Sequence, residues 1–375
     1  MVETARRRTQ PAHHAHAGIW RLVLMGWVAI SLFSGIIGGL LRAGVSWPPS
    51  LASSAWGGQA VALHAALMMC GFFGTVIGVE RAVALRRPWA FASPLLTAGA
   101  AGAWLTGQVT LGTTAALLAS GMFAVVNAAI VRKQAATHTW LLLIAGGMWG
   151  AGNLCFAWLG LQDVTVASWF SFLTLTIAAE RLEMSRLLKR PAWASPLLML
   201  IVAMQVLSVI TTLYDPRQGG VAFGLSLVAL AGWLGCFDIA RQTVRAHGLS
   251  RYMAICLLGG YIWLLAAGLS WMTYANGAPT RDAALHGLGL GFIVSMVMGH
   301  APVILPAVAG IKLHFDRRFY VPLLALHLSL LWRLGGGALR PEWKAMGATL
   351  NALSLLLFAL TVASAAWSWR RRHPR

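Results

Sequence analysis

The sequence predicts an all-α protein that crosses a membrane many times. Hydrophobic residues make up 58% of the 375 residues, and charged residues only 10%, whereas a soluble domain typically carries about 25% charged residues. Apolar runs of about 20 residues, the length of a membrane-spanning helix, recur from one end of the chain to the other. These observations exclude a soluble globular domain, a disordered chain and a collagen-like or disulfide-linked scaffold.

Twelve apolar runs are long enough to cross about 30 Å of hydrocarbon as helices. No stretch between them is long or polar enough for a soluble domain, so we expect residues 1–375 to form one transmembrane domain. The expected spans, numbered 1 to 12 in chain order, are at about 19–42, 57–80, 91–107, 111–131, 138–160, 164–184, 193–213, 220–240, 252–274, 283–308, 319–337 and 345–368.

The basic residues predict how these spans are oriented. If the runs are helices, 23 of the 29 Lys and Arg lie at alternate ends of them; the exceptions are Arg42, Arg217, Arg281, Arg333, Arg340 and Lys344. An excess of cations marks the cytoplasmic side of a membrane protein. We therefore expect both termini in the cytoplasm and an even number of crossings. The net charge of +19 then reflects membrane topology, and we expect the lipid bilayer, and no nucleic acid, as the partner of this surface.

An internal repeat predicts three units of four helices. Glu80-Arg81 is followed by Ala92-Ser93-Pro94, and Glu180-Arg181, 100 residues later, by Ala194-Ser195-Pro196. That spacing corresponds to four spans, so the two copies have the same orientation. A fainter copy near 296–324 completes a pseudo-threefold bundle in which spans 2, 6 and 10 are equivalent. The units are about 19–132, 138–241 and 252–369. The alternative is that all inner loops look alike because they are basic and contain proline.

Histidines inside the spans are the strongest candidates for function, because ionisable groups are costly within a membrane. His64 in span 2 and His286 in span 10 both lie roughly 5–10 Å below the outer surface, at corresponding places in the repeat. When His64 is superposed on His286, Glu80 aligns with Pro302. Two imidazoles at equal depth could be the axial ligands of a haem iron. The alternative is that they form ordinary hydrogen bonds among the small residues that pack membrane helices.

Two arginines lie where a haem in this position would direct its propionates. Arg42 ends span 1 and Arg333 ends span 11, both on the outer side. Guanidinium groups match carboxylates with two parallel hydrogen bonds. The alternative is that both side chains simply extend to the membrane interface.

A second pair of histidines lies closer to the inner surface. His300 and His327 are expected about 10 Å from it on adjacent spans, where Pro302 and Pro306 should break or kink span 10. A second haem, a metal ion, a quinone head group or plain hydrogen bonding would each fit these two residues. We expect Glu80-Arg81 and Glu180-Arg181 to be local ion pairs that close helix ends.

Two stretches carry a resemblance to a known family: Leu63-His64-Ala65-Ala66-Leu67-Met68 and the segment from Asp282 to Leu305. They resemble the NnrS family of twelve-span haem proteins, and the topology resembles the catalytic subunit of the haem–copper oxidases. The resemblance implies haem b held by His64 and His286, in a bacterial inner membrane. It also implies a role in nitrogen-oxide or redox stress through ligand binding or electron transfer, with quinol or a small gaseous ligand such as NO as partner.

The chain departs from the oxidases at the copper site. Those enzymes take copper ligands from spans 6 and 7, whereas residues 164–213 here contain no His. If the protein is an enzyme, we therefore expect a haem-dependent oxidoreductase without an oxidase-type copper site.

Two other functions remain open at this stage. A secondary transporter of a small solute suits twelve spans, although transporter repeats are often inverted or comprise half of the spans, and acidic residues fall only at span ends and in loops. A non-catalytic haem carrier or assembly factor for a respiratory oxidase would use the same histidines.

Overall fold

The computed structural model describes residues 11–186 and 188–373, and these residues form helices and no strand. The all-α prediction is therefore confirmed for this part of the chain. The longest helices are α1 (Pro11–Arg42), α7 (Val109–Lys133), α8 (Thr137–Leu159), α9 (Asp163–Met184), α10 (Ala194–Tyr214), α11 (Pro216–Phe237), α13 (Gly248–Ala275) and α17 (Pro341–Arg372).

Shorter helical segments make up the remaining elements. They are α2 (Pro49–Ala52), α3 (Ala55–Ala62), α4 (His64–Ala66), α5 (Thr75–Leu85), η2 (Pro88–Phe91), α6 (Ala92–Leu105), α12 (Ala240–Thr243), α14 (Arg281–His286), α15 (Ser295–Ala309), η4 (Arg317–Phe319) and α16 (Tyr320–Leu331). Helix α15 continues through Pro302 and Pro306, so these prolines do not end span 10.

Ten helices in the described part of the chain are long and apolar enough to cross a membrane, which indicates a multi-pass membrane protein. Two of the twelve expected spans are not among the ten. Helix α6 has 14 residues and is shorter than a typical span by itself, but η2 (Pro88–Phe91) leads directly into it, so the helical segment covers residues 88–105. Helix α9 is long enough, but it carries Glu180, Arg181 and Glu183 near one end.

Helix α9 lies in the core of the molecule, which explains its polar composition. Every residue from 164 to 176 is buried. Its hydroxyl groups bond to carbonyls one turn earlier, as Ser168 does to Val164 and Thr176 to Phe172. Because protein surrounds this helix, it needs no apolar face toward lipid. Its mean hydropathy is therefore lower than that of a helix that faces lipid.

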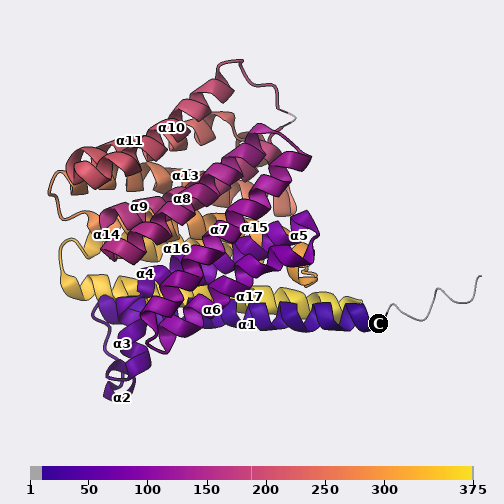
Figure 1. Cartoon of the computed structure of the whole chain (residues 1–375), viewed down its shortest axis with the longest axis horizontal. Helices are drawn as coiled ribbons and strands as arrows, with labels where there is room; N and C mark the ends of the chain where they lie inside the picture. The colour runs from indigo at the N-terminus through magenta and orange to yellow at the C-terminus, as the bar shows by residue number, and fades with distance from the viewer. Residues whose placement is uncertain (1–10, 187, 374–375) are drawn as a thin grey trace, which may run out of the picture.

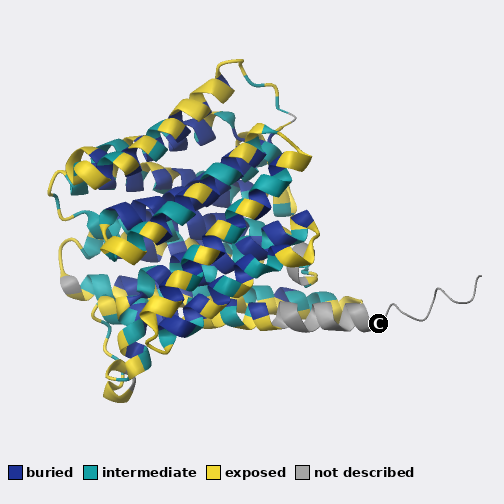
Figure 2. Ribbon diagram, in the orientation of Figure 1, coloured by how far each residue is buried: buried dark blue, intermediate teal, exposed yellow. Residues whose placement is uncertain are grey.

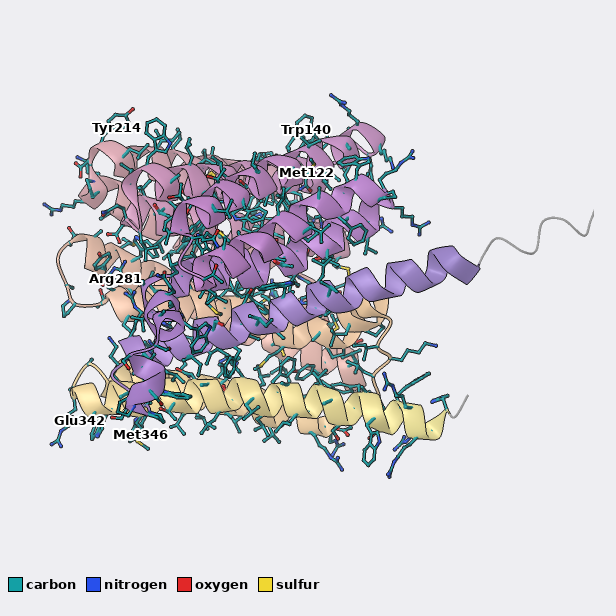
Figure 3. The ribbon with its side chains drawn as sticks, turned by 60° about the horizontal axis from the view of Figure 1, so that its bottom comes forward. Met122, Trp140, Tyr214, Arg281, Glu342 and Met346 are labelled. Atoms are coloured by element: carbon teal, nitrogen blue, oxygen red, sulfur yellow. The ribbon has the colours of Figure 1, made fainter. Side chains whose placement is uncertain are left out.

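The helices run between two opposite ends of the molecule. Figure 1 shows α1 and α17 side by side, with the start of α1 and the end of α17 at the same end, which we call the inner end. Tyr214, Arg281 and Glu342 lie at the opposite, outer end in Figure 3. Buried residues form the centre, and exposed residues cover the outside (Figure 2).

Two eight-residue π-helices follow the outer histidines. Segment η1 (Leu67–Gly74) comes three residues after His64, and η3 (Gly287–Val294) comes directly after His286. A third π-helix, η5 (Trp332–Gly336), follows α16. Interruptions of this kind inside α-helices frequently occur at functional sites.

The π-helices η1 and η3 lie 220 residues apart, so superposing them aligns Glu80 with His300. This alignment differs by two residues from the one obtained when the histidines are superposed.

Candidate functional site

His64 lies at a break in span 2 and packs against α1. The break is at Leu63, whose backbone φ is −107° and ψ is 17°. The Nδ1 atom of His64 is 2.6 Å from the carbonyl oxygen of Gly35, so Nδ1 carries the proton and donates it. A Cβ atom at Gly39 would lie 2.8 Å from Cε1 of His64. The imidazole is thus held against the glycine face of α1.

His286 ends α14 and is oriented by a carboxylate. Its Nδ1 is 3.0 Å from Oδ1 of Asp282, one helical turn earlier. The Nη2 atom of Arg333 lies 3.1 Å from Nε2 and 3.3 Å from Nδ1. A donor aligned with one ring lone pair could not be nearly equidistant from both nitrogens, so this guanidinium nitrogen lies over the face of the ring.

Both outer histidines therefore have the same protonation pattern. Each Nδ1–H donates to an oxygen, from Gly35 in one case and Asp282 in the other. That leaves Nε2 without a proton, and the contacts of the described residues place no donor in line with its lone pair. Histidines that bind metals in proteins almost always donate their second ring nitrogen in this way. The donor chemistry of the pair fits an iron ligand set.

The surroundings of this outer site are positively charged. Asp282 is bound by Arg333 through two hydrogen bonds of 2.9 and 3.0 Å, and Lys344 lies 3.7 Å away. His64 is close enough to His286, Arg42 and Arg333 for their charges to interact. Two cations thus contact one carboxylate, and the remaining positive charge suits an additional anion such as a haem propionate. Arg42 also donates to the Val61 carbonyl at 3.3 Å.

Asp282 was not predicted to be part of this site, because it lies at the end of an expected span. Its spacing of four residues from His286 was the available signal, since residues i and i+4 are neighbours on one helix face.

The glycines near the outer histidines serve mainly to pack helices. Added Cβ atoms would meet Met68 from Gly35, the backbone of Ala60 from Gly38, Trp149 from Gly74 and Trp263 from Gly291. These contacts support the packing alternative for the glycines. The two imidazoles and their partners are therefore the features that favour a haem site.

His300 and His327 have different hydrogen-bond partners. Nδ1 of His300 donates to the Met296 carbonyl at 2.7 Å, and its Nε2 accepts from Arg181 at 3.1 Å. His327 instead accepts at Nδ1 from Trp263 at 2.8 Å. Each ring has its own hydrogen-bond partner, so plain hydrogen bonding is the interpretation these contacts support. Among the described residues, no group of three or more His, Cys, Asp or Glu side chains could hold a metal ion.

A group of buried and half-buried polar residues lies at the inner end of the molecule. We call it the inner polar cluster, and it consists of Glu80, Arg81, Glu180, Arg181, Asp238 and His300. Arg81 contacts Glu80 at 2.6 Å and Glu180 of α9 at 3.3 Å. Arg181 forms bonds of 2.8 and 3.1 Å to Asp238, which follows α11, and also reaches His300. The expectation of local ion pairs thus fits Glu80-Arg81 but not Glu180-Arg181, whose arginine pairs across helices. Both side chains are almost fully buried, so little water screens the attraction between the Arg181 guanidinium and the Asp238 carboxylate.

Most of the chain matches one family. A family model described as a domain of unknown function (DUF8744) matches residues 21–367. The chain belongs to this family. The match includes every residue of the outer site and of the inner polar cluster. No curated protein and no solved structure matches the chain.

Proposed function

We propose that this protein binds one haem b between His64 and His286, near the outer end of the bundle. The single observation that carries the proposal is the shared state of these imidazoles. Each donates from Nδ1 to an oxygen, which leaves Nε2 without a proton. The resemblance to the NnrS family adds a role in nitrogen-oxide or redox stress, with NO or quinol as partner.

The chain supplies ligands, orientation and charge compensation to this site. His64 and His286 would hold the iron, while Gly35 and Asp282 fix the orientation of their rings. Arg42 and Arg333, with Lys344 nearby, would compensate the propionates. When bound, the haem supplies ligand binding and one-electron chemistry at iron. With no histidine in spans 6 and 7, an enzymatic reaction here would proceed without an oxidase-type copper site.

The proposal includes twelve spans in three units, with both termini in the cytoplasm of a bacterial cell. The inner polar cluster supports the repeat. Arg81 of the first unit bonds to Glu180 of the second, and Arg181 of the second bonds to His300 of the third. The sequence repeat aligns Glu180 with Glu80, and superposing the π-helices η1 and η3 aligns His300 with Glu80, so the three residues occupy equivalent positions. Each arginine therefore contacts the equivalent residue of the next unit, as a pseudo-threefold arrangement would produce.

The visible spectrum of the purified full-length protein tests haem binding. We expect the sharp reduced-state bands of six-coordinate haem, and we expect His64→Ala and His286→Ala each to remove them, because each variant deletes one axial ligand. His314→Ala, at a partly exposed inner-end histidine that contacts Arg372, is the matched control and should keep the bands. A colourless wild-type preparation that is folded and does not take up added haem would contradict the proposal.

Asp282→Asn tests the role of the carboxylate that orients His286. The change keeps an oxygen acceptor but removes the charge that strengthens imidazole as a ligand, so we expect haem affinity to fall by about 10- to 100-fold. Titration of haem into the apoprotein measures the effect. Asp163→Asn is the matched control, because Asp163 is also at the outer end but pairs with Arg281 and Tyr274. Equal losses in both variants would show that outer-end charge, and not orientation of His286, determines affinity.

A further inference from the structure

A cavity of about 440 Å³ opens at the inner end of the molecule, and Asp238 of the inner polar cluster borders it. It lies between the segment that follows α9 and the turn that joins α11 to α12. Its lining includes four basic side chains, namely Lys189, Arg190, Arg241 and Arg245, together with the apolar side chain of Phe237.

The positive charge of this cavity is not compensated by its own lining. Asp238 is the acidic residue that borders it, but both carboxylate oxygens of Asp238 bind Arg181. The Asp238 side chain is only 1% exposed, so its charge is used inside the protein. Four cations therefore face one cavity without an acceptor of opposite charge.

Two of the arginines are fixed in place and keep further donors. Arg190 donates from Nε to the Phe237 carbonyl at 3.2 Å and lies over the ring of Trp233 at 5.5 Å. Arg241 donates from Nη1 to the Cys236 carbonyl at 2.8 Å. The Nη2 atom of Arg190 is buried and has no acceptor. A buried guanidinium nitrogen without a partner is costly, which indicates that an acceptor from outside the chain belongs there.

We propose that this cavity binds the phosphate of an anionic phospholipid headgroup. Planar guanidinium groups match phosphate oxygens, and basic pockets between helices on the cytoplasmic side of membrane proteins bind such headgroups. A lipid fits better than a soluble phosphate because the cavity has an apolar border. Trp193, which is 57% exposed, packs against Phe237 with ring centroids 5.3 Å apart. Acyl chains would lie along this border while the phosphate enters the cavity.

The experiment uses the purified full-length protein in neutral detergent. Native mass spectrometry and thermal unfolding are measured with added phosphatidylglycerol, phosphatidylcholine or inorganic phosphate. We expect phosphatidylglycerol to bind and to raise the Tm, with little effect from phosphatidylcholine or phosphate. In Arg241→Gln/Arg245→Gln, at two exposed positions, binding should weaken about fivefold per arginine removed, as each juxtamembrane cation contributes to attraction for anionic lipid.

The control removes an equal charge from another inner-end segment. Arg132→Gln/Lys133→Gln, at the end of α7, should leave phosphatidylglycerol binding unchanged. If phosphatidylglycerol binding weakens equally in both double variants, general surface charge explains the binding and the proposal is overturned. Equal stabilisation by phosphatidylcholine would also overturn it. Protection by inorganic phosphate that displaces the lipid would identify a soluble phosphate as the ligand, contrary to the assignment.

Discussion

Replacing Arg181 with alanine should lower the free energy of unfolding by about 3–5 kcal/mol, because it leaves a buried carboxylate without its partner. Arg181 and Asp238 have side chains only 3% and 1% exposed, and their closest atoms are 2.8 Å apart. The substitution also removes the donor to Nε2 of His300. Three elements, namely α9, the turn after α11 and α15, would lose their common contact. Thermal or denaturant unfolding of the detergent-purified protein measures the change.

The same site offers a test of whether charge burial or lost packing causes the effect. Arg181→Met combined with Asp238→Leu removes both charges together, and apolar replacement of a buried pair is often neutral. We expect the double variant to recover much of the stability lost in Arg181→Ala. Arg318→Ala is the surface control: Arg318 is 76% exposed and 3.8 Å from Asp316, so its loss should be close to neutral. Similar stability of Arg181→Ala and Arg318→Ala would contradict the prediction.

The positions of the helices were predictable from the sequence because hydropathy and basic loops mark spans that face lipid. Hydropathy is a less reliable marker of a span where a helix faces protein on all sides. Helix α9 was expected at 164–184 and is found at Asp163–Met184, yet its composition does not qualify it as a span. Its serines and threonines are satisfied by carbonyls of their own helix, and local propensity gives no indication of such burial.

Partners that are distant in the sequence were harder to predict. Arg181 was assigned to Glu180, its neighbour, whereas its carboxylate partner Asp238 is 57 residues away. Hydropathy places both at the inner end but does not show which side chains meet. The outer histidines lie in two of the candidate membrane-spanning helices, but their partners Gly35 and Asp282 depend on helix rotation. The π-helices change that rotation by altering the number of residues per turn, and no pattern in the sequence predicts them.

Gly38→Ala should damage stability and the outer site together, because α1 approaches α3 most closely at this glycine. A Cβ atom there would overlap the backbone carbonyl of Ala60, and backbone cannot rotate away as a side chain can. The helices must separate, at a cost of about 1–3 kcal/mol or more. The separation would also lengthen the hydrogen bond between Gly35 and His64, which is 2.6 Å long, so we expect weaker haem binding in addition to a lower Tm.

Two neighbouring glycines of α1 distinguish helix separation from a direct effect on the imidazole. A Cβ at Gly26 has no atom within 4 Å, so Gly26→Ala should keep or slightly increase stability through helix propensity. A Cβ at Gly39 would meet Cε1 of His64 at 2.8 Å, a side-chain atom that can move by ring rotation. Gly39→Ala should therefore alter the haem spectrum with a smaller loss of Tm than Gly38→Ala. If all three variants unfold at the wild-type temperature, the close packing of α1 does not support the outer site, and His64 must be held by other contacts.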